Sequence, residues 1–328
     1  MKLDFQTRIE DSEVSILIIT GVARSGKTLV GNVLGSCQNA EHIDEPWLML
    51  AAPVLAANGD LAEPLTASLL NAYTRELFND RILLRNANFR PEDRSSIWEQ
   101  KPPTEIFDRL VRLYSRQDVR QYTRENKAVL VLTLTNMVPF AGLFARIWPA
   151  CRIVHVVRKG LEVADEIVRK GWVSDQQLRQ PQSAQPFIEY IDGEGGIFYL
   201  PFWVDKDRAG DFINASEAKR ALTYWRRLLE MAKPSLDTLK DDGRLYEVHF
   251  EGVVERPQEM LDGLIGELGL SKSYMTDGLI GRIYPDEGLG GDAVLEGLDK
   301  RDLEQVVDLY RLLALPMEHL LQEIDNKV

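Results

Sequence analysis

The chain has 328 residues, of which 45% are hydrophobic and 27% are charged. These are ordinary values for a globular protein, and they exclude a disordered or fibrous one. The net charge of −12 disfavours non-specific binding to nucleic acid or to an anionic membrane, because both kinds of binding depend on many distributed lysines and arginines. We therefore expect no nucleic-acid partner.

The cysteines and the hydropathy of the chain indicate the cellular compartment in which the protein works. The two cysteines, Cys37 and Cys151, cannot form a disulfide framework, which is typical of a reducing environment. The first residues lack the apolar core of a signal peptide, and no stretch has the roughly 18 uninterrupted apolar residues of a membrane helix. No Cys/His pair has metal-ligand spacing. We expect a cytoplasmic protein with no integral membrane segment and no metal.

Apolar runs alternate with helical patterns along the chain. The near-continuous runs 129–132 and 153–157 are typical of strands that are buried on both faces of a parallel sheet. The sequence predicts a doubly wound α/β fold with a central, mostly parallel sheet flanked by helices. The expected strands are 15–20, 128–135, 152–157 and 244–250, and the expected helices are 27–36, 61–79, 104–123, 138–147, 161–169, 215–239, 257–268 and 300–313.

The whole chain, residues 1–328, is predicted to form a single domain, because no shift in composition forces a boundary. Residues 171–211 differ from the rest, with Gln-rich and Gly-rich pieces followed by an aromatic cluster between Phe198 and Trp203. A long segment of this kind inside a compact domain usually covers an active site or shapes an acceptor pocket. We predict that it faces the substrate. The alternative is that the aromatic residues only pack the segment onto the core.

Residues 21–28 read GVARSGKT and match the nucleotide-binding pattern G-x-x-x-x-G-K-[ST] at every fixed position. An expected strand precedes the motif and an expected helix follows it. Gly21 and Gly26 allow tight bends, so that consecutive backbone N–H groups can point at an anion, and Arg24 and Lys27 add positive charge there. The sequence therefore predicts a phosphate-binding loop, or P-loop.

A nucleoside triphosphatase also needs Mg²⁺, which the loop Thr, here Thr28, normally holds together with an Asp at the end of a second apolar strand. Among the residues at the ends of the expected strands, only Glu251 is a candidate carboxylate. Arg158 lies instead at the carboxyl end of a parallel strand, where open α/β sheets bind ligands, and it suits a second phosphate better than a metal. The pattern indicates a doubly phosphorylated nucleotide bound without Mg²⁺.

Several segments, in order, resemble the sulfotransferases that use 3′-phosphoadenosine-5′-phosphosulfate (PAPS). Residues 21–29 resemble that family's 5′-phosphosulfate loop, commonly written G-x-P-R-S-G-T-T-L. Residues 144–158, continuing to 163–164, resemble the stretch that ends in the 3′-phosphate-binding Arg. Residues 225–226 resemble the family's W-R helix, and residues 246–270 resemble its Y-E-D-L-x-x-x-P strand and loop and its closing F-L-G-L helix. These segments cover much of the chain, and they imply the P-loop-like sulfotransferase fold.

The resemblance implies that an acceptor hydroxyl attacks the sulfur of PAPS in line and that 3′-phosphoadenosine-5′-phosphate (PAP) leaves. Arg24 occupies the family's catalytic basic position, and Lys27 would help to neutralise charge on the sulfuryl group. The acceptor would be a carbohydrate, a lipid or a small metabolite, and no sequence feature indicates the oligomeric state. The residues implied for donor binding are Gly21, Arg24, Ser25, Gly26, Lys27, Thr28, Leu29, Arg158 and Glu166.

Glu45 is the expected catalytic base, because it lines up with a position where many members of this family keep one. His42 is the reserve candidate, since its unperturbed pKa is already near working pH. The alternative for Glu45 is that residues 44–46 simply start a helix.

The chain departs from the family at Lys27, at Glu166 and at Lys159, which replaces the family's usual Asp. Lys27 stands where the family usually has Thr, and Glu166 stands where it has the Ser that binds the 3′-phosphate, which a carboxylate would repel. The alternative for Arg158 is an internal salt bridge to Glu162 or to Glu166. Two other functions stay open: a P-loop kinase or NTPase that uses Mg-ATP, and a non-catalytic nucleotide-binding relative.

Overall fold

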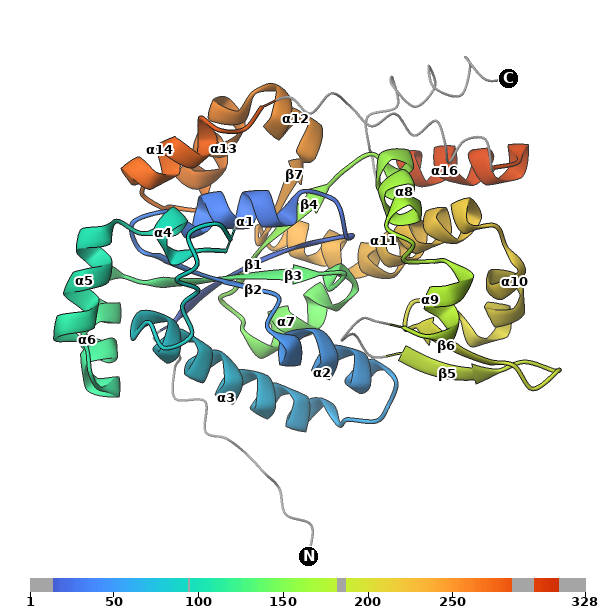
Figure 1. Cartoon of the computed structure of the whole chain (residues 1–328), viewed down its shortest axis with the longest axis horizontal. Helices are drawn as coiled ribbons and strands as arrows, with labels where there is room; N and C mark the ends of the chain where they lie inside the picture. The colour runs from blue at the N-terminus through green and yellow to red at the C-terminus, as the bar shows by residue number, and fades with distance from the viewer. Residues whose placement is uncertain (1–13, 94, 182–186, 285–297, 313–328) are drawn as a thin grey trace, which may run out of the picture. The chain divides into compact units, whose positions relative to one another are not determined.

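The structure is a computed structural model that describes residues 14–93, 95–181, 187–284 and 298–312 (Figure 1). The chain divides into two compact units. Within the described residues, unit 1 takes residues 14–21, 25–157 and 235–284, and unit 2 takes residues 22–24, 158–234 and 298–312. That residues 1–328 form a single domain stays a prediction.

Unit 1 is built on a five-stranded parallel sheet whose strand order is β2-β3-β1-β4-β7. The register places Gly21 opposite Thr135 and Asp44 opposite Thr133, so the carboxyl ends of β1, β2 and β3 meet at one edge. The predicted fold class, an α/β fold with a central parallel sheet flanked by helices, is confirmed. The strands are β1 (Ser15–Gly21), β2 (Ala40–Asp44), β3 (Val129–Thr135), β4 (Arg152–Val157) and β7 (Leu245–His249).

Helices cover both faces of this sheet (Figure 1). Alternate residues of the central strands, such as Leu17, Ile19 and Val131, form one buried cluster with α1, α13 and α14. Burying each such side chain stabilises the fold by about 1.5–3 kcal/mol. The opposite face is covered by α2, α3 and α7. These helices are α1 (Lys27–Gly35), α2 (Trp47–Ala57), α3 (Glu63–Ile82), α7 (Ala141–Ile147), α13 (Pro257–Glu267) and α14 (Tyr274–Ile280).

The remaining short elements of unit 1 correct two sequence predictions. The single helix expected over 104–123 is wrong, because Ser115 and Asp118 form a capping box that starts a new helix. The strand expected over 244–250 ends at His249, and a helix begins at the next residue. The elements are α4 (Ile97–Gln100), α5 (Pro103–Arg112), α6 (Arg116–Asn126), α12 (Phe250–Glu255) and a 3₁₀ turn, Val138–Phe140.

Unit 2 contains most of the segment that the sequence sets apart. Trp203 stacks on Tyr224 with a ring-centre separation of 4.8 Å and meets Phe212 edge-on at 5.4 Å. The aromatic cluster thus packs within unit 2, as the alternative had it, and its role as a substrate cover stays a prediction. The elements are α8 (Gly160–Arg169), α9 (Asp175–Arg179), the antiparallel pair β5 (Phe187–Ile191) and β6 (Ile197–Pro201), a 3₁₀ turn (Lys206–Arg208), α10 (Ala209–Asn214), the first part of α11 (Glu217–Asp241) and α16 (Lys300–Leu312).

Membrane crossing requires a helix that is both long and apolar. In the described parts of the chain, no helix has that combination.

Candidate functional site

The P-loop follows β1 in the chain and leads directly into α1. Ser25 is only 1% exposed, and its hydroxyl oxygen is buried with no hydrogen-bond partner among the described residues. Lys27, the first residue of α1, is 4% exposed. Leaving a buried hydroxyl unsatisfied costs about 1–3 kcal/mol. The loop therefore presents a buried donor that an anion would satisfy.

Two glycines give the loop its shape. A Cβ on Gly21 would collide with the carbonyl oxygen of Val156 and would lie 2.9 Å from the Ser25 hydroxyl oxygen. Gly26 caps α1 with a φ of 91°, and a Cβ there would run into the ring of Phe250. Glycine at the helix start leaves the first N–H groups of α1 facing outward, as anion binding needs. Thr28 and Leu29, the next residues of the motif, are half-buried in the first turn of α1. The residues present fit a phosphate group.

Arg24 and Glu166, both in unit 2, form an ion pair. Arg24 Nε donates a hydrogen bond to Glu166 Oε2 at 2.9 Å, and Nη2 lies 2.8 Å from the same oxygen. The Arg24 backbone has a φ of 67°, which is uncommon for a residue other than glycine. The structure thus brings together the two residues that the sequence assigned to catalysis and to donor binding. Their functional roles stay predictions.

Arg158 is held in the same way by a carboxylate in the first turn of α8. Its Nε donates to Glu162 Oε2 at 3.0 Å, and its Nη1 donates to the Arg24 carbonyl oxygen at 3.1 Å. The salt bridge that the sequence gave as the alternative is therefore present, with Glu162 as the partner. A bound phosphate at Arg158 remains a prediction, and it would share the guanidinium with this carboxylate.

Glu45 lies just beyond β2, at the carboxyl edge of the sheet. Its backbone N–H donates to the Thr133 carbonyl oxygen at 2.9 Å, and the Thr135 hydroxyl donates to its carboxylate. The side chain is exposed, and the residue has a φ of 46°. Because α2 begins at Trp47 with Pro46 as its N-cap, Glu45 lies one residue before the start of a helix. Thr135, the last residue of β3, holds its carboxylate at the sheet edge.

His42 is buried in β2 and has a partner on each ring nitrogen. Arg81 donates to Gln100 Oε1 at 2.6 Å, so the Gln100 amide nitrogen is the donor to His42 Nδ1, 3.0 Å away. His42 Nε2 then carries the hydrogen and donates to Thr133 Oγ1 at 2.8 Å. Burial, with a further contribution from Arg81, lowers the pKa of His42 to about 3. The ring is a neutral imidazole with both nitrogens in hydrogen bonds.

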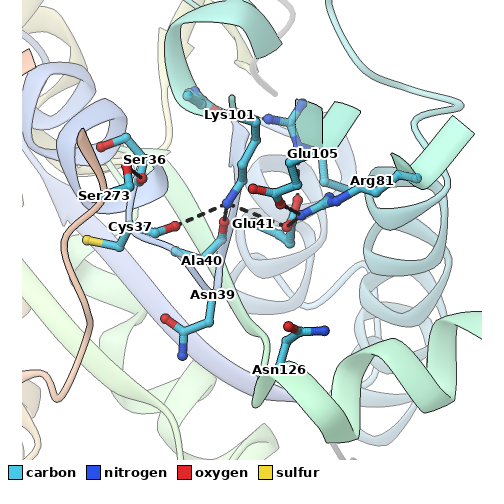
Figure 2. A network of polar contacts seen from close by, with 12 residues as sticks. Ser36, Cys37, Asn39, Ala40, Glu41, Arg81, Lys101, Glu105, Asn126 and Ser273 are labelled. Carbon is cyan, nitrogen blue, oxygen red and sulfur yellow. Dashed lines mark hydrogen bonds and ion pairs between the residues drawn. The ribbon is translucent and has the colours of Figure 1, made fainter. Parts of the chain in front are cut away.

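A buried ionic cluster anchors the start of β2 (Figure 2). Glu41 lies within ion-pair distance of Arg81, Lys101 and Arg109, and Lys101 also donates to the Cys37 carbonyl oxygen at 3.1 Å. Burial alone would raise the pKa of Glu41, but the three cations outweigh it and lower the pKa to about 2. The cluster ties β2 to the α3–α5 region and so fixes the position of this strand.

Asp44 is a site residue that sequence reasoning did not single out. It is the last residue of β2, half-buried, and its Oδ1 is buried with no hydrogen-bond partner among the described residues. Burial and the neighbouring charge of Glu45 raise its pKa to about 6, against the lowering effect of Lys27. The signal that could have found it is a carboxylate at the carboxyl end of a parallel strand, but β2 itself was not predicted.

No metal site stands out in the part of the chain that the structure describes. There, no three His, Cys, Asp or Glu side chains are grouped to hold a metal ion. Glu251, the sequence's candidate metal carboxylate, lies in the first turn of α12. The expectation that no metal is required stays a prediction.

No family model matches the chain, and no curated protein matches its sequence. Among solved structures, it is similar to the sulfotransferase domain of the Synechococcus PCC 7002 olefin synthase, with a TM-score of 0.46, 14% identity and coverage of 95% of this chain and 99% of that chain. It is also similar to a sulfotransferase domain from the curacin biosynthetic pathway, with a TM-score of 0.44, 13% identity and coverage of 92% of this chain and 98% of that chain. A sulfotransferase from Mycobacterium avium gives a TM-score of 0.46 and 11% identity, with coverage of 92% of this chain and 76% of that chain. At these TM-scores the likeness carries no argument of its own. All three similar structures are sulfotransferases, the family that the sequence motifs resemble.

Proposed function

We propose that this protein transfers a sulfuryl group from PAPS to an acceptor hydroxyl. The observation that carries the proposal is the P-loop itself. Its Ser25 hydroxyl is buried with no hydrogen-bond partner among the described residues, between two glycines at which a Cβ would collide with its neighbours. The loop leads into the positive end of the α1 dipole, and Lys27 adds a buried positive charge at the same point. These features suit the 5′-phosphosulfate of a nucleotide.

In this proposal the acceptor oxygen attacks sulfur, the bond from sulfur to the 5′-phosphate oxygen breaks, and PAP leaves. The donor supplies the activated sulfuryl group. The loop amides, Ser25, Lys27 and Thr28 would neutralise the charge that develops on the sulfuryl and bridging oxygens, and such preorganised donors are often the largest catalytic contribution. Arg24 would add to this charge stabilisation once the ligand competes successfully with Glu166.

Glu45 is the base that we propose. Its carboxylate is exposed and is held at the sheet edge by the Thr135 hydroxyl, so it can reach a proton on a bound acceptor. A positioned base contributes about 10²–10⁴-fold in rate. His42 is less suited, because both of its ring nitrogens are engaged in buried hydrogen bonds. We assign His42 to the positioning of β2 and β3.

The donor's 3′-phosphate would bind at Arg158, as the resemblance implies. Arg158 is 7% exposed, so its charge acts with little screening by water. The adjoining Lys159 lies 3.7 Å from Glu162 and partly offsets that carboxylate. Glu166 belongs to the same region of α8, and in our proposal it limits the affinity for the donor.

The acceptor in this proposal is a hydroxyl of a carbohydrate, a lipid or a small metabolite. We also propose that the protein works in the cytoplasm. The supporting observation is that Cys37 and Cys151 are free thiols buried in unit 1, which fits a reducing compartment.

Phosphoryl transfer from Mg-ATP is a second candidate function. Lys27 and Thr28 complete the nucleotide pattern of the P-loop, and Asp44 supplies a carboxylate at the sheet edge that the sequence had seemed to lack. Mg²⁺ is commonly bound through one or two carboxylates together with substrate phosphates.

Calorimetric binding of PAP, ADP and ATP, each with and without Mg²⁺, separates the two functions. We expect PAP to bind without Mg²⁺, and we expect Arg158→Ala to weaken that binding at least about tenfold, since a charged hydrogen-bonded pair is worth about 1.5–3 kcal/mol. Arg112→Ala is the control, because Arg112 is a 73% exposed side chain on α5. Mg²⁺-dependent binding of ATP, with no binding of PAP, would overturn the sulfotransferase proposal in favour of a kinase or NTPase.

A further inference from the structure

The amphipathic pattern of α5 is inverted. Helices at a protein surface usually turn their apolar side chains toward the core and their charged side chains toward solvent. In α5 the side chain of Arg109 is only 2% exposed and pairs with Glu41 of β2. Glu105, one turn earlier, pairs with the same arginine and lies at the ionic cluster (Figure 2). The inward face of this helix therefore carries charge.

The apolar side chains of α5 point outward instead. Phe107 and Val111 are each 62% exposed, and Leu110 is 46% exposed. Tyr114, just beyond the helix, is 68% exposed, and its hydroxyl donates to the Val111 carbonyl oxygen at 2.6 Å, which holds the ring at the end of the helix. Neighbours in this set are three or four residues apart, so the four side chains form one row along the helix, which we call the α5 stripe.

The size of the α5 stripe indicates what kind of contact it can make. A covered aromatic side chain buries about 150–250 Å², so at these exposures the four side chains present roughly 400–500 Å². The largest apolar patches on monomeric proteins have this size and often bind a partner. Two such stripes, packed together with their polar rims, bury about 1,000 Å² in total, which is at the lower limit for a specific interface. The area suits a reversible association.

One flank of the α5 stripe carries an acid and a base. Asp108 and Arg112 directly follow Phe107 and Val111 in the chain, so both lie on the same side of the stripe. Their side chains are 51% and 73% exposed and pair with each other at 2.7 Å. When two copies of a helix pack antiparallel about a two-fold axis, each flank meets the same flank of the other copy in reverse order. Asp108 of each copy then faces Arg112 of the other, so the face is complementary to itself in charge.

We propose that the α5 stripe is the interface of a reversible, two-fold symmetric dimer of this chain. Leu110 of the two copies meet near the axis, and Phe107 of each copy packs on Val111 of the other. Asp108 pairs with Arg112 of the other copy at both ends of the contact. An anionic membrane or a strongly acidic partner fits this face less well, because Asp108 would meet a like charge.

The position of α5 leaves the candidate site of unit 1 accessible in such a dimer. Through Arg109, α5 contacts Glu41, which is near the start of β2. The carboxyl ends of β1, β2 and β3 meet at the other end of the strands, where Glu45 follows β2. Association through α5 should therefore leave PAP binding unchanged.

Sedimentation equilibrium of the full chain, from about 5 to 500 µM, measures the association. We expect a dimer with a Kd of about 10–100 µM, in keeping with the small interface. Val111→Glu places an unpaired charge at the centre of the α5 stripe and should weaken the dimer at least about tenfold. Leu65→Glu is the matched control, because Leu65 is 41% exposed and lies at the opposite end of α3 from Arg81, and its Kd should equal that of the wild type.

A charge swap tests the two-fold pairing directly. Asp108→Arg and Arg112→Asp each place like charges opposite one another at both contacts, so each homodimer should be about fivefold weaker or more at low salt. An equimolar mixture of the two variants restores opposite charges at both contacts, so the mixed dimer should match the wild type within about twofold. These two variants keep the test decisive if Val111→Glu fails to fold.

Three results would overturn the proposal. The first is a wild type that stays monomeric over the whole concentration range. The second is a dimer that persists unchanged in a folded Val111→Glu, and the third is a mixture of the charge-swap variants that associates no more tightly than either variant alone. If a monomeric wild type binds phosphatidylglycerol vesicles, and Val111→Glu abolishes that binding, the α5 stripe faces a lipid surface instead.

Discussion

Glu166 Oε2 accepts a hydrogen bond from Arg24 Nε at 2.9 Å, between residues 142 positions apart in the chain. One helical turn earlier, Glu162 pairs with Arg158 at 3.0 Å. Residues four apart share a helix face, so one face of α8 supplies a carboxylate to each of the two arginines that the sequence assigned to the donor. Any anion that binds these arginines competes with α8.

Glu166→Gln should therefore strengthen PAP binding. The Arg24 side chain is 40% exposed, so the ion pair contributes about 1 kcal/mol or less, and its loss should raise the affinity for PAP by up to about fivefold. Calorimetry with PAP measures the change, and Asp108→Asn controls for the change in net charge. Weaker binding in Glu166→Gln would show instead that the carboxylate itself supports the donor.

Gly26→Ala should disable the P-loop. The new Cβ would collide with the Phe250 ring, and a φ of 91° is strained for alanine, so we expect a loss of about 1–3 kcal/mol in stability and of measurable PAP binding. Gly266→Ala is the matched control, because a Cβ there meets nothing within 4 Å and the residue lies in α13, where alanine is the better helix former. Thermal unfolding and calorimetry follow the two effects. Unchanged PAP affinity in Gly26→Ala would contradict the loop's assignment as the anion site.

The parts of the fold that the sequence predicts are those with a local signal. β1, the P-loop and α1 follow from one motif and the apolar runs beside it. β2 was missed because its five residues include Glu41 and His42, which read as exposed residues until the distant cations and Gln100 are known to cover them. α2 was missed because its residues, WLMLAAPVLAA, are apolar on all sides and show no helical periodicity.

The candidate site likewise has residues with a local sequence signal and residues without one. The sequence singles out the loop residues and Glu45 by their spacing and by the family resemblance, and their roles stay predictions. The pairing of Arg24 with Glu166 has no such signal, because no local pattern links residues so far apart. The sequence indicates Asp44 only as part of a helix start, and its place at the sheet edge appears only once β2 is known.

Stability in acid should depend on His42. The pKa of His42 in the folded protein is about 3, below the ordinary value of 6.5. Its contribution to the free energy of unfolding is therefore complete above pH 6.5 and is lost as pH falls toward 3. At pH 5 the loss amounts to about 2 kcal/mol. Asp44 acts in the opposite sense, because its pKa is raised to about 6 and its carboxyl favours folding as pH falls from 6 toward 3.8.

The contribution of His42 is isolated by comparing the wild type with His42→Gln, which cannot titrate there. Denaturant unfolding at pH 7 and at pH 5 should show a smaller loss on acidification in His42→Gln, by about 2 kcal/mol. Asp44→Asn should show a larger loss than the wild type. Equal losses in the wild type and His42→Gln would contradict a neutral, buried His42.

The ionic cluster around Glu41 should behave as one unit in a double-mutant cycle. Glu41→Gln removes the carboxylate that three buried cations share and leaves Glu105 as a partner of Arg109, and we expect it to cost about 3–5 kcal/mol. Arg109→Met removes one of those cations, so the double variant should be more stable than the sum of the single losses predicts, by at least about 1 kcal/mol.

Arg112→Met, on the exposed side of the same helix as Arg109, should change stability by about 0.5 kcal/mol or less. Denaturant unfolding of the four proteins of the cycle gives the coupling. Additive losses between Glu41→Gln and Arg109→Met would mean that the two side chains act independently.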